Sequence, residues 1–456
     1  MKLENFTGSK QTILFHRRLF QEHLEEASFL YEQRKGLLHD PEMTWLDIRA
    51  FEDRLIGHLQ ALVKGGEDAR DYCLEVVDYD EAGELFVAAS LFCLQQEWAP
   101  IISFTSKLNP NDDNGLDAVR DAFKHFWPNR WNDQVRPLFD QHPDTSILLL
   151  PTVIGFQRLP YEQVLTKSIS DCPEEHLYLL IWSLGRLQVR TVNSALFSFL
   201  ENKDVMIKAA ASLALLRSGQ KVTHYKLSSG VRFNFSDLLQ MMLSGSSKDV
   251  VTLIGQLENS DQSDNISLTL GVLGDVQAVP VLLRLLDNET TAESAAVGLN
   301  LITGADLYEE VFVPDEIDPD ELLDDELEKL NSGEPLYALG EEPGANIVRL
   351  SMDAEVWQSW WLQNSKRFRP GVRYRAGRSF SPMCLIDNLR NEKMPFFLRQ
   401  IAYEELVARY GINVHFEADM MVKDQMTAIE EMSSLVAQSG RRWIDGQWYF
   451  AGSLLD

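Results

Sequence analysis

A repeat of about 30 residues constrains the fold of this chain more than any other feature. Six windows resemble one another: SLFCLQ from residue 90, VIGFQR from 153, SLGRLQ from 183, SLALLR from 212, TLGVLG from 269 and GLNLIT from 298. Successive windows start roughly 30 residues apart, except for two intervals of about double that length. The two long intervals predict further members near 121 and 240. The apolar segments AFKHFW and LQMMLS begin at 122 and 239.

Each repeat unit contains a second amphipathic segment, so the unit is predicted to be a helix pair. These segments precede four of the windows, at 161–169, 192–200, 250–257 and 279–286. Small residues recur where a second helix would pack closely, at Gly155, Gly185, Ala214 and Gly271. The pattern predicts an all-α fold, a HEAT-like α-solenoid. The alternative is a non-repetitive helical domain with accidental spacing.

The flanking segments complete a four-part organisation. Residues 1–66 are predicted to be an N-terminal helical cap, with one helix at 11–36 and a second that follows a capping box of Thr44 and Asp47. Three parts follow: the solenoid at 67–305, an acidic linker or strap at 306–343, and a C-terminal helical domain at 344–456, with a further helix pair and an aromatic cap. Alternating apolar residues at 221–237 predict one short β-hairpin insertion, which is either a binding element or a decorative loop.

Two neighbouring segments carry opposite charge. Residues 306–342 hold 15 acidic residues and one basic residue, a net charge of −14 out of −27 for the chain. Residues 366–400 hold nine basic and two acidic residues, a net charge of +7. Three interpretations remain open: the acidic strap folds back on the basic segment, the basic segment binds an external anionic ligand or partner, or both are simply solvated.

Tryptophan and arginine residues after the acidic segment form the candidate binding site. Three tryptophans lie at i, i+3 and i+4 on one predicted helix face, and three arginines follow in a glycine-punctuated turn. This composition is typical of binding hot spots. The candidate protein-binding residues are Trp357, Trp360, Trp361, Arg373, Arg375 and Arg378. The competing interpretation is that the tryptophans pack on the last repeat and the arginines hold the strap.

Composition and motifs argue against several classes of function. A net charge of −27 disfavours proteins that hold nucleic acid or dock on anionic lipid, and leaves a basic protein partner open. The sequence has no Gly-rich phosphate loop, HExxH, GxSxG or CxxC motif, so we expect no cofactor, no metal and no catalytic residues. The N-terminus does not resemble a secretory signal, and no apolar run approaches the length that a membrane-spanning helix needs. We therefore expect a cytoplasmic protein without membrane insertion.

Several longer segments carry a family resemblance. FEDRLIGHLQALVKGG, the stretch from GVLGDVQAVP to LITGADL, WWLQNSKRFRPGVRYRAG and LRQIAYEELVARYG occur in that order, on either side of the acidic linker. In this the chain resembles a poorly characterised family of bacterial HEAT-like-repeat proteins, often associated with type VI secretion gene clusters. The ITGxDL and RFxxGxRYxxG elements are its most specific parts. The resemblance implies a fold and a cellular setting, and no catalytic residue follows from it.

The sequence thus predicts a non-enzymatic protein-binding scaffold or adaptor. In the setting that the resemblance implies, it would be an accessory protein of a bacterial secretion system that grips an effector or a secretion component in its concave face. One alternative is an immunity protein that neutralises a basic toxin. A third hypothesis is a HEAT-like enzyme that acts on nucleic acid, which would need a basic concave face. The oligomeric state stays open.

Overall fold

The computed structural model describes residues 10–222, 234–257, 263–315, 322–332, 335–337, 343–440 and 442–455. These residues form mainly α-helices, joined by short 3-10 turns, and six short β-strands. The predicted all-α class is therefore confirmed. The β-hairpin predicted at 221–237 falls mostly on residues 223–233, which lie outside the described residues.

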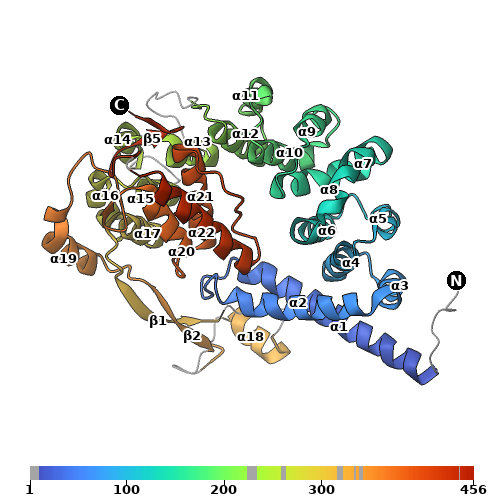
Figure 1. The fold of residues 1–456 in the computed structure, drawn as a ribbon. Helices are drawn as coiled ribbons and strands as arrows, with labels where there is room; N and C mark the ends of the chain where they lie inside the picture. The colour runs from blue at the N-terminus through green and yellow to red at the C-terminus, as the bar shows by residue number, and fades with distance from the viewer. Residues whose placement is uncertain are drawn as a thin grey trace.

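Eight helices form one continuous row, because each contacts the next along the chain. All eight predicted windows lie at the C-terminal ends of these helices, so the repeat locates every member of the row. Figure 1 shows the row as a curve that runs from α4 through α12 to α17. The members are α4 (Ala82–Gln95), α6 (Asp113–Phe126), α8 (Pro143–Phe156), α10 (Glu174–Arg186), α12 (Val205–Arg217), α13 (Phe235–Ser244), α15 (Ser263–Leu273) and α17 (Ala292–Thr303).

Shorter helices alternate with the members of the row and pack against them. Figure 1 shows α5, α7, α9 and α11 on the outer side of the curve. The four amphipathic segments of the sequence correspond to α9, α11, α14 and α16. The shorter helices are α3 (Gly66–Val76), α5 (Trp98–Thr105), α7 (Val135–Gln141), α9 (Glu162–Ser168), α11 (Asn193–Phe199), α14 (Ser247–Gln256) and α16 (Val279–Leu285).

Glycines in the row allow neighbouring backbones to approach closely. A Cβ atom at Gly155 would lie 2.7 Å from the Cα atom of Ser183, and one at Gly185 would lie 2.8 Å from the Cα atom of Ala214. A Cβ atom at Gly271 would lie 2.4 Å from the Cα atom of Gly298. These separations are shorter than van der Waals contact, so any larger residue would push two helices of the row apart.

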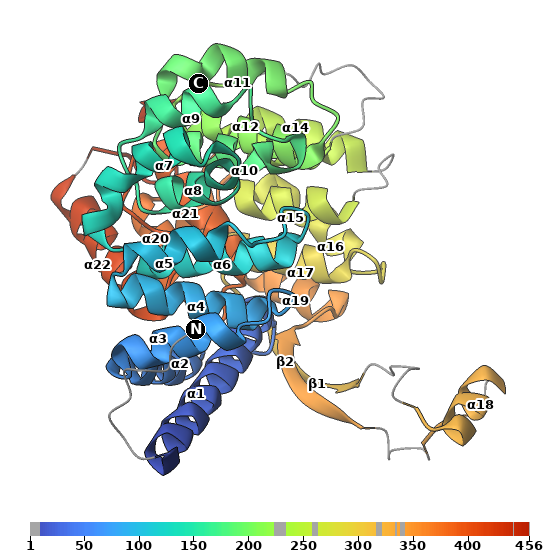
Figure 2. The ribbon, with the colours of Figure 1, turned by 90° about the vertical axis from the view of Figure 1, so that its right-hand side faces the viewer.

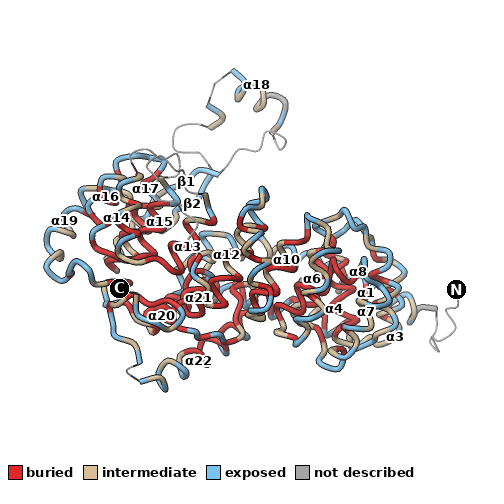
Figure 3. The backbone as a smooth tube through the Cα atoms, turned by 90° about the horizontal axis from the view of Figure 1, so that it is seen from above, coloured by how far each residue is buried: buried red, intermediate tan, exposed pale blue. Residues whose placement is uncertain are grey.

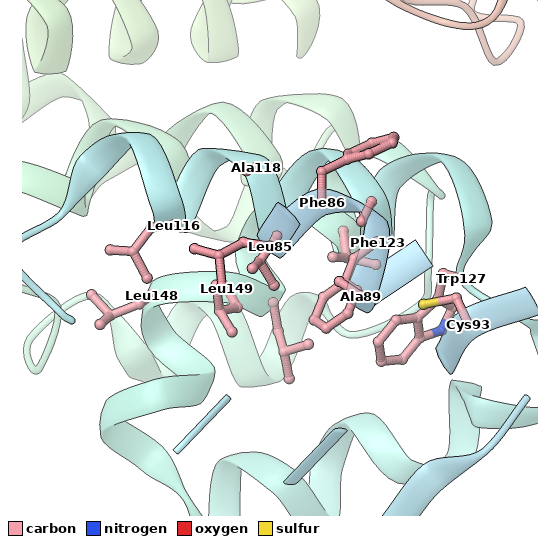
Figure 4. Packing of buried hydrophobic residues seen from close by; sticks show 14 of the residues in the cluster. Leu85, Phe86, Ala89, Cys93, Leu116, Ala118, Phe123, Trp127, Leu148 and Leu149 are labelled. Atoms are coloured by element: carbon pink, nitrogen blue, oxygen red, sulfur yellow. The ribbon is translucent and has the colours of Figure 1, made fainter. Parts of the chain in front are cut away.

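Apolar side chains between adjacent members fill the interior of the row. Figure 4 shows this packing where α4, α6 and α8 meet, with Leu85, Phe86, Phe123 and Leu149 among the labelled residues. All four are almost completely buried. Burial of each such side chain contributes about 1.5–3 kcal/mol, so every interface within the row is stabilised by its own apolar contacts.

The C-terminal helices lie inside the curve of the row (Figure 1). We call residues 381–455 the C-terminal module. Its helix α21 contacts α12 and α13, and its helix α22 contacts α2 at the other end of the curve. Figure 3 shows α21 as a mostly buried helix beside α12 and α13. The module contains α20 (Pro382–Arg390), α21 (Phe396–Tyr410), α22 (Val422–Gln438), β5 (Tyr449–Phe450) and β6 (Ser453–Leu454).

Two N-terminal helices complete the body. The first is α1 (Lys10–Leu37), and the second is α2 (Ile48–Lys64). The predicted capping box is present: the Thr44 backbone N–H donates to Asp47, and the Asp47 backbone N–H donates to the Thr44 hydroxyl. Both helices contact α4, so they extend the row at its first member.

The acidic segment begins as one strand of a β-hairpin. Strand β1 (Tyr308–Pro314) pairs antiparallel with β2 (Gly344–Leu350), and α18 (Asp324–Ser332) lies between them in sequence. We call the two strands the arm. Figure 2 shows the arm projecting from the body below α17. The chain returns to the body through α19 (Ala354–Asn364) and the two-residue strands β3 (Tyr374–Arg375) and β4 (Arg378–Ser379).

Candidate protein-binding site

The three predicted tryptophans have different environments on α19. Trp357 is buried, and its indole N–H donates a hydrogen bond of 2.6 Å to the backbone oxygen of Ser351. Trp360 and Trp361 are half-buried, and their rings lie 6.4 and 5.3 Å from the ring of Phe368. Trp357 therefore anchors α19 to the body, and only Trp360 and Trp361 expose part of their surface.

Two of the three predicted arginines are interior residues. Arg373 and Arg375 are fully buried, and both form ion pairs with the carboxylate of Glu405 on α21. Arg409, one turn further along α21, pairs with the same carboxylate at 2.9 Å. We call these four residues the Glu405 cluster. In the folded protein, Arg373 and Arg375 are therefore not available to a partner.

The surplus positive charge of the Glu405 cluster is satisfied by helix C-termini. Arg373 and Arg375 donate to the backbone oxygen of Val272 at the end of α15, at 2.9 and 2.7 Å. Arg409 donates to the backbone oxygen of Met242 near the end of α13, at 2.7 Å. Because the last carbonyls of a helix have no partner within the helix and carry partial negative charge, they are suitable acceptors for guanidinium groups. The cluster therefore joins the C-terminal module to the row.

Protonation in the Glu405 cluster follows from burial and from the neighbouring charges. Burial alone would raise the pKa of Glu405, but Arg373, Arg375 and Arg409 outweigh it and lower this pKa. Burial lowers the pKa of Arg409 to about 9. The carboxylate therefore stays charged at neutral pH. Removing one partner of such a buried pair costs about 3–5 kcal/mol, so the cluster has a structural role.

Arg378, the third predicted arginine, is exposed and pairs with Asp387 at 2.6 Å. Further along the basic segment, Arg390 also pairs with Asp387, and Arg399 donates to Gln425. Lys393 lies 4.2 Å from the ring centroid of Tyr308, at the base of the arm. Among the described residues, no basic group of 366–400 forms an ion pair with the acidic segment. The structure therefore gives no support to a strap that folds back on these arginines.

A second set of charged contacts runs along the C-terminal ends of the row, and we call it the charged seam. Lys124 on α6 pairs with Asp419 at 2.7 Å, and Arg158 after α8 pairs with Glu417 at 2.8 Å. Three further pairs lie at the ends of α10 and α12: Arg186 with Glu417 at 2.6 Å, Arg186 with Glu404 at 2.8 Å, and Arg217 with Glu404 at 2.7 Å. Part of the inner side of the curve is therefore basic, and acidic residues of the C-terminal module already occupy it.

The charged seam lowers the pKa of Glu417 and of Asp419. Burial would raise the pKa of Glu417, but Arg186 and Arg158 lower it. Burial would likewise raise the pKa of Asp419, but Lys124 and His125 lower it. Sequence reasoning missed this seam, although the signal was present. Three successive repeat windows carry a basic residue within their last three positions, at Arg158, Arg186 and Arg217.

The seam also bears on the expected place of partner binding. We predicted that a partner would be gripped in the concave face of the row. The structure instead places the C-terminal module there, tied to the row by the charged seam and the Glu405 cluster. The repeat pattern could not show this, because the contact between Arg217 and Glu404 joins residues 187 positions apart.

The arm exposes a group of apolar side chains. Its base is fixed to the body, since the Ser351 backbone N–H donates to the Leu307 oxygen at 2.7 Å. Beyond its base, Phe312, Val313 and Val348 are exposed by 46%, 37% and 62%. Cross-strand register places Phe312 opposite Asn346 and two positions from the Glu310–Val348 pair, so Phe312 and Val348 share one face.

Two physical arguments make the arm a candidate binding surface. An isolated two-stranded hairpin is at best marginally stable in water, and exposed apolar residues grouped together typically mark interaction sites. The chain between β1 and β2, residues 315–343, carries 12 acidic residues and one basic residue, whereas the two strands carry only Glu309, Glu310 and Arg349. The apolar side chains of the arm are therefore next in sequence to a strongly acidic stretch, a combination that suits a protein with basic and apolar surface.

None of the described helices is both long and apolar enough to cross a membrane. Within the described ranges, no group of three His, Cys, Asp or Glu side chains is arranged to hold a metal ion. No protein-family model matches the chain, and no curated protein matches its sequence.

Proposed function

We propose that this protein is a non-enzymatic binding scaffold or adaptor whose docking element for a basic protein is the arm. The observation that carries this proposal is the arm itself, which projects from the body, exposes Phe312 and Val348 on one face and flanks a strongly acidic segment. Charge complementarity would steer a basic partner to it and make the association sensitive to salt.

The body in this proposal is a HEAT-like α-solenoid. The regular row of helices, the alternating shorter helices and the glycines at close approaches support this architecture. The C-terminal module braces the curve from the inside. A braced solenoid holds its surfaces in fixed positions, which is what a scaffold requires.

The cellular role follows only from the resemblance to proteins associated with type VI secretion genes. In that setting the partner would be an effector or a component of the secretion apparatus. An immunity protein for a basic toxin is the second candidate, because the same acidic arm suits such a toxin. The two roles differ on gene deletion: loss of an immunity protein poisons cells that retain the toxin gene, whereas loss of a scaffold abolishes secretion in healthy cells.

Affinity capture with matched variants tests the arm. The arm variant is Phe312→Ser with Val348→Ser. The control variant is Met206→Ser with Val251→Ser, which removes two apolar side chains that are exposed by 58% and 57% on the body. We expect a basic protein to be retained by the native chain and the control variant, to be lost by the arm variant, and to form a stoichiometric complex when both proteins are purified. Equal retention by all three chains would show that the arm is not the docking element.

A further inference from the structure

An exposed basic surface lies close to the base of the arm. Helix α19 exposes Val356 by 41% and Leu362 by 79%. The turn that follows exposes three basic residues within four positions. We call these residues the ledge: Val356, Leu362, Lys366, Arg367 and Arg369.

The basic residues of the ledge have no carboxylate partner among the described residues. Arg367 makes only a long hydrogen bond of 3.4 Å to Asn364 and lies 6.0 Å from the ring of Phe368. This contrasts with Arg373, Arg375, Arg378 and Arg390, which all pair with carboxylates. Lys393 and Arg399 of the basic segment also lack a carboxylate partner among the described residues, but Lys393 lies over the ring of Tyr308 and Arg399 is buried and donates to Gln425. The ledge is thus a stretch of three exposed basic residues whose charge is unmatched within the described chain.

The ledge and the arm are complementary in two respects. The arm exposes apolar residues beside an acidic segment, and the ledge exposes apolar residues beside a basic turn. In the described chain, however, the arm does not cover the ledge of its own molecule. Figure 1 shows that α19 and the arm extend in different directions from the point where β2 meets the body. Only residues 351–353 connect β2 to α19, so the arm has little freedom to fold back.

We propose that the arm of one molecule docks on the ledge of a second copy. The two surfaces differ, so the contact is heterologous, and repetition of it generates a closed ring or an open filament. The assembly uses the same arm as the proposed scaffold function, so a basic partner protein would compete with it. The contact depends on exposed charges, which salt screens, so assembly is strongest at low salt.

Molar mass in solution tests this proposal directly. At low salt and micromolar concentration, light scattering should give at least twice the 52.0 kDa of one chain, and high salt should return the monomer. The ledge variant Lys366→Glu, Arg367→Glu, Arg369→Glu should be monomeric at both salt concentrations. The matched control reverses three exposed basic residues elsewhere, Arg190→Glu, Lys203→Glu and Lys248→Glu, and should assemble like the native chain.

Mixing two variants that do not assemble alone tests whether the arm pairs with the ledge. The ledge variant keeps its arm, and the variant Phe312→Ser with Val348→Ser keeps its ledge. Each alone should be monomeric, and an equimolar mixture should form a dimer that grows no further, because only one arm–ledge contact can form. A monomeric native chain at low salt, or a ledge variant that assembles normally, would overturn the proposal. The ledge variant retains the arm, so its capture of a basic protein tests the proposed scaffold function independently of self-assembly.

Discussion

Two groups of carboxylates in this protein have opposite environments. Those of the C-terminal module, at Glu404, Glu405 and Glu417, are buried and paired with arginines of the row or of the segment before the module. Of the two carboxylates on the arm, Glu310 is exposed, whereas Glu309 is half-buried and forms an ion pair with Arg349 of the neighbouring strand, at 3.4 Å. The same chemical group joins parts of the molecule in one region and is available to a partner in the other.

The difference shows what decides the role of a charge in this fold. The row presents a basic residue at the end of several helices, and any acidic segment that lies across those ends becomes structural. The arm leaves the body beyond the last helix of the row, away from those residues. Net charge alone therefore does not identify a binding surface; the position of each charge relative to the repeat does.

The largest effect should come from breaking the Glu405 cluster. We expect Glu405→Gln to lower the free energy of unfolding by about 4 kcal/mol, because it leaves three buried guanidinium groups without a charged partner. Glu310→Gln on the arm should change it by less than about 0.5 kcal/mol, as for most surface substitutions. Urea unfolding followed by tryptophan fluorescence measures both. Similar losses for the two variants would remove the distinction between the two regions.

The next effect separates the buried tryptophan from its half-buried neighbours. Trp357→Ala should lower the free energy of unfolding by about 3 kcal/mol, since it leaves a cavity and an unpaired acceptor at Ser351. Trp360→Ala should cost less, because part of its surface is already in water. If Trp360→Ala lowered the free energy of unfolding more than Trp357→Ala does, the packing assigned to α19 would be incorrect.

Acid should remove the stability that the charged seam and the Glu405 cluster give to the C-terminal module. The pKa values of Glu405, Glu417 and Asp419 are lowered in the folded state. Their contribution to stability is therefore fully present above the unfolded-state pKa of about 4, and it is lost as the pH falls through the folded-state values. The double variant Glu417→Gln with Asp419→Asn should be less stable than the native chain at pH 7. Its stability should also fall less steeply between pH 5 and pH 3, as measured by urea unfolding at each pH. Parallel pH profiles would contradict a stabilising seam.

Much of the row was predictable, because a period of about 30 residues is a local signal that repeats. The positions of AFKHFW and LQMMLS followed from the interval alone, and both lie in helices of the row. The contacts of the C-terminal module were not predictable in the same way, because they join residues far apart in sequence. Opposite charge in neighbouring segments suggested that the strap pairs with Arg373 and Arg375. Their partner is instead Glu405, within the largely apolar helix sequence IAYEELVARY. An acidic residue within such a helix was itself a sign that a buried basic partner exists.

The candidate site was predictable only in part. Trp357, Arg373 and Arg375 have a composition typical of a hot spot, but burial decides whether such residues face a partner or the interior, and a sequence does not state burial. The arm was expected to be a linker, because its acidic composition disfavours burial. Strand pairing of YEEVFVP with GANIVRL depends on register between two segments that the most acidic stretch of the chain separates. The apolar residues exposed on that pairing are what single out the arm.

The smallest change in the free energy of unfolding is expected for substitutions in the arm. The arm and α21 should nevertheless differ most clearly in their local dynamics. Phe312→Ser with Val348→Ser should change the free energy of global unfolding by less than about 0.5 kcal/mol, because the two residues already expose 46% and 62% of their surface. Hydrogen exchange should nevertheless distinguish the regions. Amides of β1 near Phe312 should exchange through local opening, whereas those in the middle of α21 should exchange only through global unfolding. A bound partner or a second copy should slow exchange in the arm and leave α21 unchanged. Equal protection of the arm and α21 in the isolated monomer would show that the arm is already part of the body, and the docking proposal would lose its basis.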